Sequence, residues 1–397
     1  MTSEASVMTE ETTPRRPLTA VQRGIVASLT DSDPTMVPKK VTYLRTEVFT
    51  SQEYFELEQK KLFRGKPVPI EVSAALPKPK MHVINEDYGT SVLLTRDDTG
   101  KVHAFLNVCM HRCIQLSREK EAKSGGLIVC PYHAWSYNMR GELVGVPRED
   151  VFPGLDKKKH SLKRLECVEA GGIIWVNLDP NSNADFSIVS GDLAAEFDAI
   201  GLPKQVVYTK ARYEIKANWK FVHDAFLENY HIPRLHSKSL GSMFVDRPTA
   251  FTQIGPHLLQ SSARAGYKAE QGEGMQTFED FRASGVFSYT LIPGSIVITS
   301  PTYINVMFLS PQSPDKTVIN YYMLVDRMPE TEKEKARCEK SIELMQRVTT
   351  DEDFWVSELG TIGVKTGAVE QLTLGGMEQD VATFHKVLEE QMGLASG

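Results

Sequence analysis

The sequence lacks the features that would assign it to a membrane or nucleic-acid-binding class. No apolar run approaches the roughly 20 residues that a transmembrane helix needs, and stretches such as Gly171–Leu178 have the length of a strand. The opening segment MTSEASVMTEETTPRRP has no apolar core, so we expect neither a signal peptide nor membrane association. Lysine and arginine total 45 against 51 acidic residues, a net charge of −6, which does not favour nucleic-acid binding.

Cysteine is also scarce. The five cysteines are too few for a disulfide scaffold, and an odd number without a signal peptide favours reduced thiols in the cytoplasm. No glycine-rich dinucleotide motif follows a predicted strand, and no flavin motif is present. We therefore expect any nicotinamide or flavin cofactor to belong to a separate protein.

Composition divides the 397 residues into three segments. Residues 1–40 are polar and rich in Thr, Ser and Pro, which predicts an N-terminal arm that is mobile or wraps over the surface. Residues 41–180 begin with a short amphipathic helix at 51–63 and continue as short β-like runs between turn residues, typical of a compact antiparallel β domain. Residues 181–397 mix helical and strand patterns, so the predicted fold class is α+β. In this last segment the patterns predict helices at 193–200, 219–231 and 330–350 and strands at 286–309 and 317–325.

Two Cys/His pairs lie in the predicted β domain. Cys109-x-His111 is followed, after eighteen residues, by Cys130-x-x-His133. Such pairs predict two loops that converge on a metal, either tetrahedral zinc or a [2Fe–2S] cluster of the Rieske type, in which two His replace two Cys on one iron. One Cys and one His from each loop favours the Rieske cluster, because zinc fingers usually pair Cys with Cys and His with His. The other three cysteines are predicted not to be ligands: Cys113, Cys167 and Cys338.

The segment NWKFVHDAFLENYHIPRLH carries a second group of candidate ligands. If residues 219–231 are helical, Asp224, Glu228 and His231 lie on one face. Pro233 would end this helix and let His236 fold back towards His231. Two imidazoles and a carboxylate form the facial triad of non-haem Fe(II) oxygenases, which leaves positions open for O₂ and substrate. The alternative is that these histidines are surface or helix-capping residues.

Taken together, the two segments resemble the alpha subunit of the Rieske non-haem iron ring-hydroxylating oxygenases over roughly residues 40–390. The resemblance is carried by N-x-C-x-H-R from Asn107, C-P-Y-H-x-W from Cys130, and N-W-K from Asn218 with its two downstream histidines. Cys113 and Ala134 depart from the pattern, since the family has Gly at the first position and often at the second. Neither is a ligand position, so the departures concern only the loop conformation.

The resemblance implies a Rieske [2Fe–2S] domain followed by a helix-grip catalytic domain, in which helices cover an antiparallel sheet. It implies that the cluster is held by Cys109, His111, Cys130 and His133. It also implies that His231 and His236 hold a mononuclear Fe(II) together with an aspartate far downstream.

For this third ligand, the family pattern E-D-x-x-V-x-E fits the chain from Glu352, which makes Asp353 the predicted ligand and Asp351 the next candidate. Glu228 stands where the family has a bridging carboxylate. That group would hydrogen-bond an imidazole of the iron site and a Rieske histidine of the neighbouring subunit. Asp224 stands at a polar position near the iron, and with Glu228 it is a candidate catalytic residue.

The implied function is that of a terminal oxygenase, which hydroxylates its substrate with O₂ and electrons from NAD(P)H delivered by a reductase, a ferredoxin or both. An aromatic or hydrophobic substrate is expected from the candidate pocket residues, which are Phe226, Phe244, Phe287, Tyr289, Ile296, Ile298, Tyr303 and Met307. Oxidative O- or N-dealkylation by a Rieske monooxygenase is the alternative reaction. A homotrimer is expected, and the resemblance leaves the presence of a small beta subunit open.

Two other classes of protein account for fewer of these features. An electron-transfer protein with a Rieske cluster needs only one small domain and would leave the His231/His236 segment without a role. A zinc protein with no redox function would be colourless, whereas a Rieske protein is red-brown.

Overall fold

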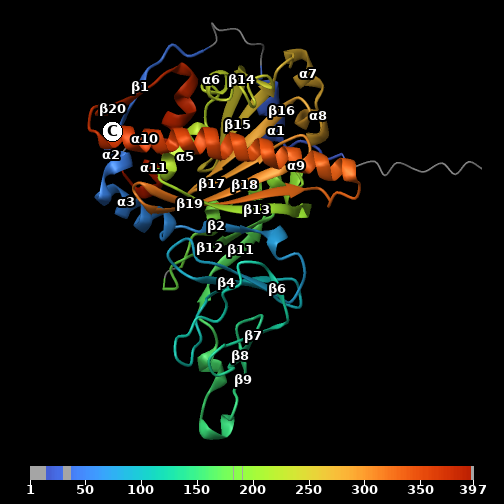
Figure 1. The fold of residues 1–397 in the computed structure, drawn as a ribbon, viewed down its shortest axis with the longest axis vertical. Coiled ribbons are helices and arrows are strands. Elements are labelled where there is room, and N and C mark those ends of the chain that lie inside the picture. Colours follow the sequence, from blue (N-terminus) through green and yellow to red (C-terminus); the bar gives the residue numbers. More distant parts are fainter. Residues whose placement is uncertain (1–14, 30–36, 182, 190, 395–397) are drawn as a thin grey trace, which may run out of the picture.

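The computed structural model describes residues 15–29, 37–181, 183–189 and 191–394. Figure 1 shows a narrow lower part built from strands β2 to β12 and a broader upper part in which helices surround a large sheet. We call residues 68–176 the β domain and the rest of the described chain the mixed domain. Within the described ranges, no helix is long and apolar enough to cross a membrane.

The β domain is built from three antiparallel sheets. The sheet next to the mixed domain has the order β11 (Cys167–Ala170), β12 (Ile173–Val176), β2 (Val68–Val72). The middle sheet has the order β10 (Arg164–Leu165), β5 (Val102–Leu106), β4 (Val92–Arg96), β3 (Met81–Asn85), β6 (Lys123–Ser124). The sheet furthest from the mixed domain has the order β7 (Leu127–Val129), β8 (Ser136–Asn138), β9 (Leu143–Gly145). Its short strands form two hairpins, as the turn residues predicted.

The mixed domain is organised around one seven-stranded antiparallel sheet. Its order is β13 (Val206–Ile215), β19 (Lys316–Val325), β18 (Ile304–Ser313), β17 (Ser295–Thr299), β16 (Gly285–Leu291), β15 (His257–Arg264), β14 (Phe244–Ile254). The α-helices that follow the β domain in the chain are α4 (Gly191–Ala199), α5 (Trp219–Ala225), α6 (Ile232–Leu235), α7 (Ala269–Gly274), α8 (Phe278–Arg282), α9 (Glu332–Gln346), α10 (Trp355–Lys365) and α11 (Gln379–Met392). Figure 1 shows α9 running across the sheet. The α+β fold with antiparallel sheets is therefore confirmed.

Alternation along the strands buries both faces of this sheet. On one face, Ile296 and Met307 pack in a cluster with Val222 of α5 and Met345 of α9. The opposite face packs in another cluster with α1, α4 and α8, and this cluster includes Trp175 of the β domain. The sheet therefore lies between α5 and α9 on one face and Trp175 of the β domain on the other.

The N-terminal residues contact the mixed domain. Helix α1 (Ala20–Ala27) starts at a capping box formed by Thr19 and Gln22 and buries Ile25 and Val26 in the core of the mixed domain. This part of the predicted 1–40 arm therefore wraps over the surface, whereas residues 1–14 and 30–36 lie outside the described ranges.

The segment before the β domain also contacts the mixed domain. Strand β1 (Thr42–Arg45) pairs with β20 (Gln371–Leu374), and α2 (Glu47–Thr50) follows it. The predicted helix at 51–63 is present as α3 (Gln52–Glu58) with a π-helical turn after it. Glu58 forms a buried ion pair with Lys220 of α5 at 2.6 Å. The domain boundary at residue 41 stays a prediction. Residues 42–63 contact β20 and α5, both of which belong to the mixed domain.

The predicted helix at 219–231 is too long. Asn218 caps α5 through its side chain, and the helix ends at Ala225. The N–H of Leu227 donates to the carbonyl of Asp224 at 3.2 Å, a turn of the tighter i+3 type. Pro233 lies in the first turn of α6, where its missing N–H costs nothing, and does not terminate α5. Glu228 and His231 therefore lie on a connection between two helices.

Candidate metal centres and substrate cavity

The two Cys/His pairs lie on two loops with matching backbone conformations. The N–H of Cys113 donates to the carbonyl of Cys109, and the N–H of Ala134 donates to the carbonyl of Cys130, each at 3.0 Å. Cys113 and Ala134 both have φ of 56°, in the left-handed region that favours glycine. These are the two positions where the sequence departs from the family pattern. Since both side chains are exposed, the turn is kept at only a backbone cost.

The side chains of the four cluster candidates converge. Cys109 and Cys130 are buried, and the rings of His111 and His133 lie 4.7 Å apart between centroids. The Nδ1 atom of His133 is buried and has no hydrogen-bond partner among the described residues. The hydroxyl of Tyr137 lies 3.3 Å from the sulfur of Cys109.

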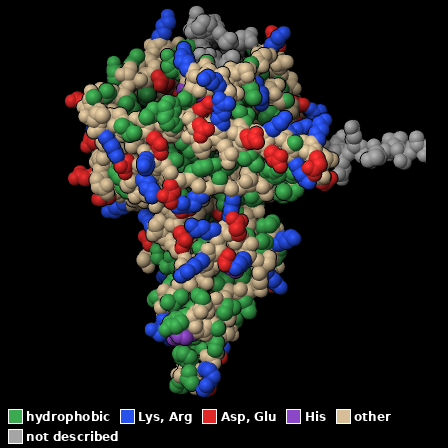
Figure 2. All heavy atoms as spheres, viewed as in Figure 1, with side chains coloured by type: hydrophobic (Ala, Val, Ile, Leu, Met, Phe, Trp, Pro, Cys, Tyr) green, Lys and Arg blue, Asp and Glu red, His purple; other side chains and the backbone are tan. Residues whose placement is uncertain are grey.

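The surroundings of the two thiols favour a bound metal. Burial raises the pKa of the Cys109 thiol, and the neighbouring Cys130 raises it further. A pair of thiolates here therefore requires a positive partner, and two thiols with two imidazoles fit a [2Fe–2S] cluster. Figure 2 shows histidine at the surface near the end of the β domain, among hydrophobic side chains.

The second group of candidates meets in the mixed domain. One ligand atom from each of His231, His236 and Asp353 lies within 4.8 Å of the others. The Nε2 atoms of the histidines are 3.2 Å apart, and Oδ1 of Asp353 lies 3.1 Å from Nε2 of His236 and 3.8 Å from Nε2 of His231. This oxygen is buried without a hydrogen bond of proper geometry. An unsatisfied buried carboxylate oxygen facing two imidazole nitrogens fits a divalent metal ion.

Asp353 reaches this position from an irregular part of a long helical segment. Residues Arg347–Phe354 form π-helical turns between α9 and α10, a widened conformation frequent at functional sites. Because of the wider turn, neighbouring residues contact the same imidazole: Oε2 of Glu352 lies 2.7 Å from Nδ1 of His236, while Asp353 faces Nε2. Burial alone would lower the pKa of His236, but these two carboxylates outweigh it and raise the pKa. The same negative potential attracts a metal cation.

Glu228 holds the other histidine. Its carboxylate pairs with Nδ1 of His231 and accepts the backbone N–H of the same residue at 3.1 Å. Both Nδ1 atoms of the pair are thus bound by glutamates, which leaves both Nε2 atoms directed at Asp353. Partners of this kind fix the ring orientation of a metal ligand. Glu352 is the residue here that sequence reasoning missed, although it stands beside Asp353 in the E-D pair.

The other two acidic candidates point elsewhere. Asp351 is exposed and accepts a hydrogen bond from Thr350, so it is not part of the cluster of ligand atoms. Asp224 lies 3.0 Å from Nε2 of His385 on α11 and is not among the residues that line the cavity described next. His385 was not identified from the sequence, and no pattern around it signals this contact.

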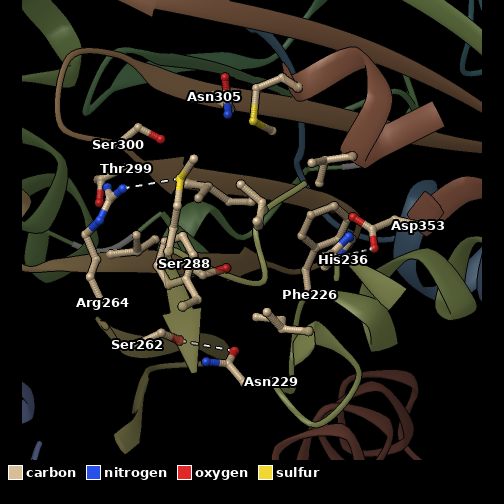
Figure 3. A pocket seen from close by; sticks show the side chains of 18 of the residues that line it. Phe226, Asn229, His236, Ser262, Arg264, Ser288, Thr299, Ser300, Asn305 and Asp353 are labelled. Carbon is tan, nitrogen blue, oxygen red and sulfur yellow. Dashed lines mark hydrogen bonds and ion pairs between the residues drawn. The ribbon is translucent and has the colours of Figure 1, made fainter. Parts of the chain in front are cut away.

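A cavity of about 300 Å³ is lined in part by His231, His236 and Asp353, which we call the triad. Of the apolar side chains predicted to line a pocket, Phe226, Phe244, Ile298 and Tyr303 do so. The other four belong to the packed core: Phe287, Tyr289, Ile296 and Met307. The lining also includes polar side chains that were not predicted, several of which Figure 3 labels: Asn229, Ser262, Arg264, Ser288, Thr299, Ser300 and Asn305. The cavity wall is mainly apolar, as expected, although four of the predicted side chains do not line it and several polar ones do.

Comparison with known proteins identifies both domains. Residues 66–162 match the Rieske [2Fe–2S] domain, and residues 204–394 match the catalytic domain of the ring-hydroxylating alpha subunit. The carnitine monooxygenase oxygenase subunit of Escherichia coli (strain K12) is 26% identical over 365 residues, covering 89% of this chain and 94% of the relative.

Two further relatives agree with this match. The methanesulfonate monooxygenase hydroxylase subunit alpha of Methylosulfonomonas methylovora is 28% identical over 311 residues, covering 71% of this chain and 72% of the relative. The crystal structure of a quaternary ammonium Rieske monooxygenase with L-carnitine superposes with a TM-score of 0.74 at 21% identity, covering 90% of this chain and 97% of the other. At this identity the superposition shows the fold.

An iron–sulfur domain joined to a mononuclear-iron domain defines an oxygenase that carries its own electron relay. The chain belongs to the Rieske non-haem iron ring-hydroxylating oxygenases, and it is the alpha, or terminal oxygenase, subunit.

Proposed function

We propose that the chain catalyses monooxygenation of a small organic substrate at a mononuclear Fe(II) held by His231, His236 and Asp353. The observation that carries the proposal is the convergence of these three ligand atoms within 4.8 Å at a cavity. Monooxygenation is supported by the two relatives above, which are named as monooxygenases. Oxidative N-dealkylation is the particular reaction that the carnitine monooxygenase supports most directly.

Dihydroxylation of an aromatic ring is the second candidate. It is supported by the aromatic and aliphatic part of the cavity lining, which includes Phe226, Phe244 and Tyr303. Product analysis with ¹⁸O₂ separates the two reactions, since one oxygen atom enters the product in monooxygenation and two enter in dihydroxylation.

In the proposed mechanism Cys109, His111, Cys130 and His133 hold the [2Fe–2S] cluster. The two metal sites together supply O₂ activation and electron transfer, and the protein supplies binding, orientation and exclusion of water. Glu228 and Glu352 orient the two histidines, so they are positioning residues. Asp224 anchors α5 to α11 through His385, and we assign it to positioning of the helix and not to catalysis.

The electrons come from NAD(P)H through a separate reductase, a ferredoxin or both. Within one chain, the loops of the cluster lie at the far end of the β domain from the triad (Figure 1). We therefore propose a homotrimer in which Glu228 connects the iron site to the cluster of a neighbouring subunit. An exposed apolar stripe on α10, formed by Trp355, Leu359 and Ile362, supports such an association. We place the protein in the cytoplasm, which is supported by the lack of a disulfide among its five cysteines, two of them proposed cluster ligands.

Metal analysis combined with EPR tests the proposal. Anaerobically purified protein is expected to hold about three irons and two acid-labile sulfides per chain, with a rhombic signal of low average g on reduction by dithionite. Zinc without such a signal would remove the oxygenase proposal. Light scattering tests the assembly, and a fully active monomer in solution would contradict the role given to Glu228.

A further inference from the structure

The cavity has two chemically different ends. Figure 3 shows Phe226 near His236 and Asp353, while Arg264 lies at the other end with Thr299 and Ser300. All six residues line the same cavity of about 300 Å³. A bound molecule therefore meets the ring of Phe226 beside the candidate iron ligands, and a cation with two hydroxyl groups at the other end.

The sheet register brings this polar surface together. Gln260, Ser262 and Arg264 alternate along β15, so their side chains share one face. The same row continues across the sheet, since Gln260 pairs with Ser288, Ser288 with Ile298, and Ile298 with Asn305. These lining residues thus lie on consecutive strands of the seven-stranded sheet. Side chains on strands hold a ligand more precisely than side chains on loops do.

The guanidinium of Arg264 has no carboxylate within ion-pair distance among the described residues. Nη2 of Arg264 lies 3.6 Å from the sulfur of Met243, and Cζ lies 5.2 Å from the centroid of the Phe244 ring. Arg16 and Arg282 in the same domain are, in contrast, paired with Glu279 and Asp326. Arg264 is half-buried, so its charge is partly removed from water, and an anionic group of a ligand would compensate for that cost.

Three uncharged groups that line the cavity can donate a hydrogen bond and have no partner among the described residues. The Nδ2 atoms of Asn229 and Asn305 and the hydroxyl of Ser288 are buried and have no hydrogen-bond partner among the described residues. The oxygen of each amide is already engaged, since Asn229 accepts from Ser262 at 3.2 Å and Asn305 accepts from Tyr321 at 2.7 Å.

The carboxylates that line the cavity, in contrast, are directed at the candidate iron ligands. The carboxylates of Glu228 and Asp353 both face the histidines. Apart from the candidate iron ligands, the cavity therefore offers the guanidinium of Arg264 and three unpaired hydrogen-bond donors. These groups complement an anion.

We propose that Arg264 binds a carboxylate or sulfonate group of the substrate, so that the substrate of this oxygenase is a small organic anion with its apolar part at the triad. The planar guanidinium fork matches both groups in a bidentate geometry. This inference rests on the proposed function, because it identifies the substrate class of the same site.

Binding to the metal-loaded holoenzyme tests the inference with matched probes. Isothermal titration compares benzoate and benzenesulfonate with neutral benzamide, and glycine betaine with choline, which lacks the carboxylate. We expect at least one anionic probe to bind about 10- to 100-fold more tightly than its counterpart without the anionic group. The benzoate and benzenesulfonate arms distinguish a carboxylate site from a sulfonate site.

Three variants assign the preference to Arg264. Arg264→Gln is expected to abolish the discrimination, and Arg264→Lys to restore part of it, because the charge returns without the bidentate fork. Arg148→Gln removes the same charge from an exposed site and is expected to change nothing. Equal binding of anionic and neutral probes by the wild type, or discrimination that survives in Arg264→Gln, would overturn the proposal.

These outcomes are distinguishable from failure of the proposed function. A wild type with its full iron and sulfide content that shows no anion preference leaves the oxygenase proposal intact and removes the anion site. A wild type without mononuclear iron removes the oxygenase proposal, whatever the probes show.

Discussion

The two metal centres of this chain differ in how their ligands are distributed along the sequence. The cluster candidates lie on two short loops within one β domain, and the two loops have the same backbone hydrogen bond at the same turn position. The iron candidates come from two distant segments, and His236 and its partner Glu352 are 116 residues apart. The cluster site is formed by local turns, so the spacing of its residues in the sequence predicts it. The iron site joins distant segments and depends on tertiary packing.

The largest effect on activity is expected from replacing a proposed ligand of the [2Fe–2S] cluster. Cys130→Ser should eliminate the [2Fe–2S] cluster, because one thiolate of the set is lost, and reductase-driven turnover should become undetectable. Visible absorption and sulfide analysis measure the cluster. Cys113→Ser is the control, since that thiol is exposed at the turn of the other cluster loop and is not a proposed ligand. Loss of the cluster in both variants would show that loop conformation, and not ligation, explains the result.

The mononuclear iron should be lost without loss of the [2Fe–2S] cluster. Asp353→Ala is expected to lose the mononuclear iron while keeping the cluster, with activity lowered by more than about 100-fold, because loss of an outer partner alone costs 10- to 100-fold. Iron content should fall by one third relative to wild type. Asp351→Asn, two residues away and exposed, should retain iron and activity. Retention of iron in Asp353→Ala would contradict the ligand assignment.

Glu228 sharpens the comparison because it is proposed to connect the two centres. Glu228→Gln should keep both metals and lower steady-state turnover by about 10- to 100-fold. The decisive reading is the rate at which the reduced cluster is oxidised when O₂ and substrate are added to fully reduced protein. A slower rate is expected for Glu228→Gln and an unchanged rate for Glu332→Gln on the exposed start of α9. A normal rate of cluster oxidation with low turnover would assign Glu228 to positioning of His231 only.

The smallest effect concerns the contact between the two domains. Glu71 of β2 is buried and accepts a hydrogen bond from Tyr322 of β19 at 3.0 Å. Burial raises its pKa from 4.5 to about 7, against the opposing effect of this hydrogen bond. The folded protein therefore keeps a proton that the unfolded chain loses above pH 4.5, so the stability contributed by this group falls as pH rises towards 7.

Glu71→Gln removes this proton equilibrium. Between pH 5 and pH 8 the wild type is expected to lose about 2–3 kcal/mol of unfolding free energy relative to the variant. Chemical denaturation of both holoproteins at the two pH values gives the difference. An equal pH dependence of the two proteins would show that Glu71 ionises normally in the folded state.

Several site residues were predictable because local chemistry restricts them. His231 and His236 are close in sequence, and the proline between them favours a turn, although it starts α6 and does not end α5. The family pattern predicts Asp353 ahead of Asp351, and the burial of the two side chains agrees with that order. Of the two aspartates, Asp353 is buried in the π-helical segment, while Asp351 is exposed.

The polar lining of the cavity was not predicted, although its signal is present. The alternation of Gln260, Ser262 and Arg264 in a strand places three polar side chains on one face. Read alone, such a face indicates a solvated edge of a sheet. Only the crossing of α9 and the connection after α5 over that face convert it into the wall of a cavity.

The sequence by itself determined the class of both metal centres, because ligand identity and short spacing are properties of the chain. It also determined the succession of an antiparallel β domain and a mixed domain, since turn residues and apolar periodicity are local. Tertiary structure alone decided that Glu352 holds the ring of His236 and that Arg264 faces the same cavity. The first contact joins residues 116 positions apart and the second depends on strand register, and local patterns do not encode either.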